Sequence, residues 1–165
     1  MPFVARPVDV VEEEEGAPVA VAGENALRKA LAAGAAGDEI TLGVDTIVVL
    51  GLEIYGKPPT AAAARATLER LSGQTHEVIS AVALLRADGS VDATQERTTV
   101  TFRALDDAML DWYVASGEWD GRAGGYAIQG RGGALIRRIE GDYLNVVGLP
   151  VAALLDAGLP GFASS

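Results

Sequence analysis

An apolar run at Ile47–Leu50 constrains the fold of this chain more than any other stretch of its sequence. Four consecutive apolar residues, most of them β-branched, predict a strand that is buried on both faces. Asp45 lies two residues before the run, where a carboxylate is badly placed to be a solvated surface charge, and Lys57 follows in the turn Gly56-Lys57-Pro58. A carboxylate and a cation beside a buried strand together predict a site for an anionic, phosphorylated ligand.

The segments on either side of this strand predict a single α/β domain. Strands are expected at residues 40–50, 78–85 and 91–102 and, in shorter form, near residue 128 and at 135–139. Helices are expected at about residues 19–33, 61–71 and 151–155. A further helix should begin at Asp106 or Asp107 and turn Met109, Trp112 and Tyr113 toward the core. Helices alternate with strands early and hairpins dominate the middle, so we expect a mixed sheet.

The composition excludes several classes of function. The chain has 165 residues, a net charge of −10, no cysteine and a single histidine, His76. The charge argues against a nucleic-acid partner, and the lack of cysteine rules out disulfides and thiolate metal sites and fits a reducing cytoplasm. No apolar run approaches the ~18 residues of a membrane span, and Met1–Val4 has neither a basic segment nor a cleavage site. We therefore expect a cytoplasmic protein without a membrane partner.

Asp45 is the strongest candidate for chemistry. A strand-end aspartate more often caps a turn, but with Lys57 nearby it is placed to bind a divalent metal or to orient an attacking water. Gln129 lies among apolar residues, where an unpaired amide costs about 1–3 kcal/mol, and the edge of a nucleobase offers it both a donor and an acceptor. On base rates the remaining polar candidates are solvated or structural groups: Glu12–Glu15, Lys29, His76, Glu118 and Arg122.

Six stretches of the sequence, taken in order, resemble the Maf family of nucleoside triphosphate pyrophosphatases. They are Asp45–Val49, Gly56–Pro58, Leu71–Val78, Ser116–Glu118, Ala123–Gly130 and Ile139–Pro150. The resemblance implies the fold shared with inosine triphosphatases, in which a long twisted mixed sheet with flanking helices forms two lobes around a nucleotide cleft. It also implies hydrolysis between the α and β phosphates with Mg²⁺ or Mn²⁺, a cytoplasmic location and a homodimer.

Matching the motifs residue by residue assigns roles to six side chains. Asp45 would be the proton acceptor or a metal-organising carboxylate, and Glu12 would be a second metal carboxylate, although Val11 stands where the family usually has an aspartate. Two lysines, Lys29 and Lys57, would contact the phosphates. Thr46 and Gln129 look like the branch of the family that acts on dTTP and UTP, because glutamine can pair with the amide edge of thymine or uracil.

One departure from the family concerns the start of the chain. Family members begin with a strand and a Ser-x-Ser-Pro-Arg-Arg loop, whereas Met1–Val4 matches the sequence that normally follows that region. We expect a single Maf-like domain over residues 1–165 that lacks this phosphate-gripping loop and has an open sheet edge. The favoured explanation is a start codon assigned too late. The alternative is a catalytically impaired paralogue that binds a nucleotide or regulates cell division, and the upstream DNA distinguishes the two.

Overall fold

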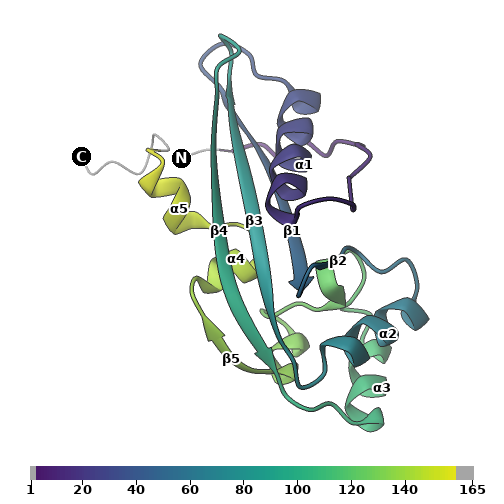
Figure 1. The fold of residues 1–165 in the computed structure, drawn as a ribbon. Coiled ribbons are helices and arrows are strands. Elements are labelled where there is room, and N and C mark those ends of the chain that lie inside the picture. The colour runs from purple at the N-terminus through teal and green to yellow at the C-terminus, as the bar shows by residue number, and fades with distance from the viewer. Residues whose placement is uncertain (1–2, 159–165) are drawn as a thin grey trace.

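The computed structural model describes residues 3–158, so Met1 and Pro2 lie outside it, and its centre is a five-stranded sheet (Figure 1). The strands are β1 (Ile40–Leu50), β2 (Glu53–Tyr55), β3 (Thr75–Arg86), β4 (Val91–Phe102) and β5 (Ile136–Glu140), in the order β2-β1-β3-β4-β5. Every neighbouring pair is antiparallel, so the α/β class is confirmed but the mixed sheet is not. The helix between β1 and β3 packs at one end of the sheet instead of forming a parallel crossover.

Five α-helices surround this sheet in the described residues. They are α1 (Pro18–Ala33), α2 (Ala61–Leu71), α3 (Asp107–Ala115), α4 (Tyr143–Val147) and α5 (Val151–Asp156), with 3₁₀ turns at Ala123–Gly125 and Arg131–Leu135. Side chains cap two of these helices. Thr60 accepts from the Ala63 N–H at the start of α2, and Asp106, one of the two starts predicted for α3, accepts from the Met109 N–H.

Two local predictions are wrong. The segment near residue 128 is a turn, not a strand. Trp112 is 46% exposed, and Leu110 occupies the core beside Tyr113 in its place. The short elements β2 and α4 were not predicted at all, because each is held by tertiary contacts and has little periodicity of its own.

Helix α1 covers one face of the sheet at very short range. Its contact stripe consists of Ala22, Ala26 and Ala30, all almost fully buried against the strands. On β1, Gly43 faces this stripe, and a Cβ added there would lie 2.0 Å from the Ala26 carbonyl oxygen. Small side chains on both elements therefore bring the backbone of α1 directly onto β1, which places the polar residues of the same helix beside Asp45.

The opposite face carries the second lobe, which contains the larger core. This core comprises Val48, Leu68, Leu71, Val78, Val100, Phe102, Leu110, Tyr113, Tyr126 and Leu135, drawn from the strands, α2, α3 and the 3₁₀ turns. β2 pairs only with Val48–Leu50, so residues 40–47 of β1 have a strand partner on the β3 side alone among the described residues. Within residues 3–158 no helix has the length and apolarity needed to cross a membrane.

Candidate active site

A pocket of about 250 Å³ lies at the open edge of β1, between α1 and the second lobe. Because successive strand residues point to opposite faces, Asp45 faces α1 and Thr46 faces α4. Both residues nevertheless line one pocket at this edge of the sheet. The predicted site residues that meet here are Lys29, Asp45, Thr46, Lys57 and Gln129.

Asp45 lies at the centre of a buried polar cluster. Its side chain is 4% exposed, Lys29 Nζ donates to Oδ1 at 2.6 Å, and Asn25 Nδ2 donates to Oδ2 at 3.2 Å. A carboxylate removed from water to this extent needs such partners. The alternative that Asp45 merely caps a turn is not what the contacts show, because both of its oxygens bind side chains of α1.

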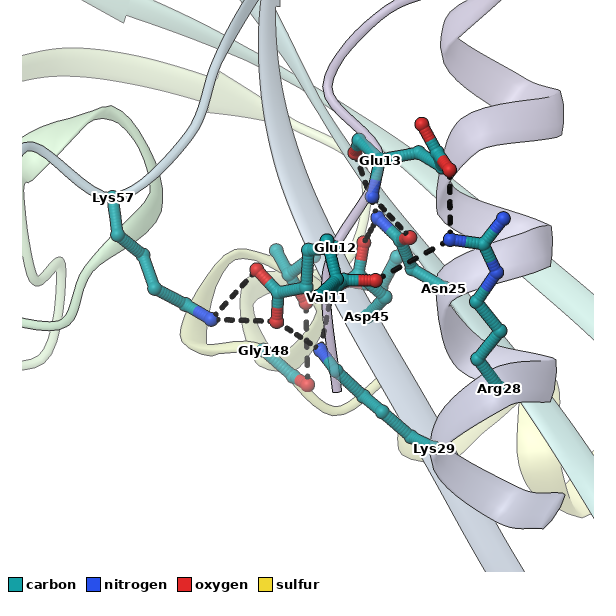
Figure 2. Close-up of polar contacts among 11 residues, drawn as sticks. Val11, Glu12, Glu13, Asn25, Arg28, Lys29, Asp45, Lys57 and Gly148 are labelled. Carbon is teal, nitrogen blue, oxygen red and sulfur yellow. Dashed lines mark hydrogen bonds and ion pairs between the residues drawn. The ribbon is translucent and has the colours of Figure 1, made fainter. Parts of the chain in front are cut away.

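Glu12 joins the two predicted phosphate lysines (Figure 2). Its Oε1 lies 2.6 Å from Lys29 Nζ and 2.8 Å from Lys57 Nζ. Burial opposes ionisation of Glu12, but the hydrogen bonds from the two lysines outweigh it and hold the pKa of Glu12 below its usual range. Burial likewise disfavours the Lys29 ammonium, yet its bonds to Asp45 and Glu12 raise the pKa of Lys29. Lys29 is therefore a charged, half-buried member of the site and not a solvated helix lysine.

Asn25 holds the segment that carries Glu12. It accepts from the Glu13 backbone N–H at 2.8 Å and donates to the Glu13 carbonyl at 3.0 Å, while also contacting Asp45 (Figure 2). Arg28 supports the same segment through the Val11 carbonyl. Sequence reasoning missed Asn25. Its signal was one amide within the alanine stripe of α1, where a buried polar group needs a partner.

Gln129 is exposed, which corrects the expectation that its amide is buried among apolar residues. It lines the pocket, and the amide has no role in the packing of the core. Its loop is held by Tyr113, whose phenolic oxygen accepts from the Ala127 N–H, and by Glu118, which accepts from the Arg131 N–H at 2.6 Å. Glu118 is thus a loop anchor instead of a solvated charge.

His76 is structural, as the more common role of a lone histidine suggested. Its Nε2 lies 2.9 Å from the Tyr126 phenolic oxygen, and its ring packs edge-on against Phe102 and Tyr126. Burial lowers the pKa of His76 to about 4, so the imidazole is neutral at physiological pH. Arg122 is exposed, as the sequence suggested, and it also lines the pocket.

The donor set around Lys29 suits a hard divalent cation. Glu12 and Asp45 both place a carboxylate oxygen 2.6 Å from the same ammonium, so their oxygens converge on one cation. Residues 3–158 contain no gathering of three or more acidic, histidine or cysteine side chains placed to hold a metal. Two carboxylates completed by substrate phosphates and water are the usual environment of Mg²⁺. Glu12 and Asp45 thus offer two oxygen ligands of the kind such an ion needs, and both of them contact the Lys29 ammonium in this structure.

Known proteins resemble this chain over most of its length. A family model for Maf-like proteins matches residues 1–157. The chain is 46% identical to a dTTP/UTP pyrophosphatase of Symbiobacterium thermophilum over 154 residues, which cover 92% of this chain and 79% of that protein. It is 45% identical to one of Pyrococcus furiosus (69% of this chain, 60% of the relative) and 51% identical to one of Myxococcus xanthus (72% and 62%). For the last two relatives the match spans less than two thirds of their own length. The extent of these matches, together with the fold, shows that this chain belongs to the Maf family.

Proposed function

We propose that this protein is a nucleoside triphosphate pyrophosphatase that hydrolyses dTTP and UTP to the monophosphate and pyrophosphate. The observation that carries the proposal is the contact of Lys29 with both Asp45 and Glu12, on the wall of a pocket that also holds Thr46 and Gln129. Cations and carboxylates are the groups that bind a polyphosphate and its metal ion, and hydroxyl and amide groups are those that form hydrogen bonds to a base. The relatives named above carry the same activity in their names.

The chain's own residues divide into two functional groups. Lys29 and Lys57 neutralise the phosphates, and a bound triphosphate takes over the lysine contacts that Glu12 makes in the free protein. Asp45 accepts the proton of the attacking water, and Asn25 keeps its other oxygen oriented. Arg122 adds a further charge at the pocket wall. Thr46 and Gln129 contact the base.

Glu12 and Asp45 are also the residues that would hold Mg²⁺ or Mn²⁺. When bound, such an ion neutralises charge on the phosphates and aligns the reacting groups. The proposal includes a single catalytic domain over residues 1–165 and a cytoplasmic location, where nucleoside triphosphates are found. It also includes a homodimer, which light scattering on the purified protein tests directly.

The test is pyrophosphate release from a panel of dTTP, UTP, dCTP, CTP, dGTP and dATP, with Mg²⁺ or Mn²⁺ present. The proposal predicts turnover of dTTP and UTP well above that of the other nucleotides. Orthophosphate release without pyrophosphate would indicate cleavage at the terminal phosphate and would contradict it. Lack of turnover of both dTTP and UTP would also contradict it.

A further inference from the structure

Thr46 is held by a buried hydroxyl on the neighbouring strand. The antiparallel register places Thr46 opposite Ser80, and their hydroxyl oxygens are 2.8 Å apart. Ser80 is fully buried and lies 3.2 Å from the Asn145 carbonyl oxygen in α4. The Gly148 carbonyl oxygen, just after α4, lies 3.5 Å from the Thr46 hydroxyl. The Thr46 hydroxyl can therefore form hydrogen bonds in three directions: to the Ser80 hydroxyl, to the Gly148 carbonyl, and to a ligand in the pocket.

Counting protons decides what Thr46 offers to a ligand. Each hydroxyl carries one proton, and a carbonyl oxygen only accepts. If Ser80 donates to Asn145, the short contact between the hydroxyls requires that Thr46 donates to Ser80. If Ser80 donates to Thr46 instead, the Thr46 proton goes to the Gly148 carbonyl. An arrangement that aims this proton into the pocket keeps only one of these hydrogen bonds within the protein, whereas each of the first two arrangements keeps two. The Thr46 proton is therefore used within the protein, and a lone pair faces the ligand.

We propose that Ser80 fixes Thr46 as a hydrogen-bond acceptor and thereby selects bases that carry an imide N–H. This inference rests on the proposed function, which assigns the pocket to a nucleoside triphosphate. Thymine and uracil present N3–H between two carbonyls, whereas N3 of cytosine is itself an acceptor and meets the Thr46 lone pair unfavourably. Gln129 provides either a donor or an acceptor by turning its amide, so it does not discriminate between these bases by itself.

Ser80 is accordingly a positioning residue that acts through Thr46. It has no exposed surface and does not line the pocket. A merely structural serine would change the stability of the fold and the turnover of all nucleotides together. A residue that sets the direction of the Thr46 proton changes the ratio between substrates.

The experiment compares kcat/KM for dTTP, dCTP and N3-methyl-dTTP in the wild type, Ser80→Ala and Ser72→Ala. Ser72 is the control, because its hydroxyl accepts a hydrogen bond from the Leu105 N–H at 2.8 Å and, like Ser80, it does not line the pocket. Ser80→Ala frees the Thr46 proton, so the preference for dTTP over dCTP should fall about three- to tenfold. Ser72→Ala should keep the wild-type ratio. A folded Ser80→Ala variant with an unchanged ratio would overturn the inference.

The wild type provides a second test that needs no variant. N3-methyl-dTTP lacks the imide proton, so its kcat/KM should fall at least tenfold below that of dTTP, and equal use of both would overturn the inference while leaving the proposed function intact. Affinities for the non-hydrolysable α,β-methylene analogues of dTTP and dCTP test the role of Ser80 in base selection separately from the proposed pyrophosphatase activity. A preference for the dTTP analogue without hydrolysis supports the inference and contradicts the function. Equal affinity contradicts the inference.

Discussion

Gly43 of β1 lies so close to Ala26 of α1 that a side chain cannot fit between them. A Cβ at Gly43 would be 2.0 Å from the Ala26 carbonyl oxygen and 2.5 Å from the Ala30 nitrogen. These are backbone atoms, which cannot rotate out of the way. The approach of helix and strand also fixes the distance between the polar residues of α1 and Asp45.

Gly43→Ala should therefore damage stability and activity together. Overpacking of this kind lowers the free energy of unfolding by about 1–3 kcal/mol, and the displaced α1 carries Lys29 away from Asp45. Chemical denaturation and kcat/KM for dTTP measure the two effects. Gly23→Ala is the matched control, because Gly23 lies in α1 and a Cβ there would have nothing within 4 Å. This substitution should stabilise the protein slightly. Unchanged activity in Gly43→Ala would contradict the role given to this contact.

Asn25→Leu should lower both stability and activity. The change leaves the Glu13 N–H and carbonyl without the amide, which costs about 1–3 kcal/mol, and releases Glu12 from its place between the lysines. Steady-state kinetics with dTTP should show a lower kcat. Leu154→Ala, which makes a cavity beneath α5 outside the pocket lining, provides a destabilised comparison that should keep kcat. An equal loss of kcat in both variants would reduce Asn25 to a stability role.

Glu12→Gln should increase the affinity for inorganic pyrophosphate in metal-free buffer. The carboxylate that pairs with Lys29 and Lys57 competes with a bound anion, and its removal should tighten binding roughly fivefold. Hydrolysis in the presence of Mg²⁺ should decrease, because one proposed metal carboxylate is lost. Titration calorimetry with EDTA measures the affinity. Glu15→Gln makes the same charge change at an exposed position, and an equal gain there would show that only net charge matters.

His76 should make stability depend on pH between about 6.5 and 4. The buried imidazole has its pKa lowered to about 4, whereas in the unfolded chain it titrates near 6.5. Below pH 6.5 the unfolded state takes up the proton first, so stability that is fully present above 6.5 is lost as the pH falls, by roughly 3 kcal/mol in total. Denaturation of the wild type and of His76→Gln should differ in slope over this range. Parallel curves would contradict the assignment.

The sequence predicted those parts of the molecule that depend on neighbouring residues. The bounds of β1, α2 and β4 follow from apolar runs and from caps such as Thr60, which act within a few residues. Asp45 and Lys57 were found in the same way, because the strand and the turn that hold them are adjacent in the chain. Gln129 was singled out as an amide among apolar neighbours, and family motifs added Lys29 and Thr46. The structure places all three on one pocket.

The contacts that could not be predicted join segments far apart in the chain. The amide of Asn25 reaches Glu13 and Asp45 only because α1 crosses β1 at Gly43, and no local pattern encodes that crossing. The pairing of Thr46 with Ser80 likewise depends on the register of two strands separated by α2. The antiparallel order of the sheet was missed for the same reason.

The measurement that tests the account most directly is pyrophosphate release from dTTP by the wild type, Asp45→Asn and the control Asp38→Asn. Asp38 is an exposed aspartate in the turn before β1, so its substitution makes the same change of charge away from the pocket. The wild type and Asp38→Asn should release pyrophosphate at similar rates. Asp45→Asn, which retains the fold but has lost the proton acceptor, should be slower by about 100-fold or more. Full activity in Asp45→Asn would contradict the account.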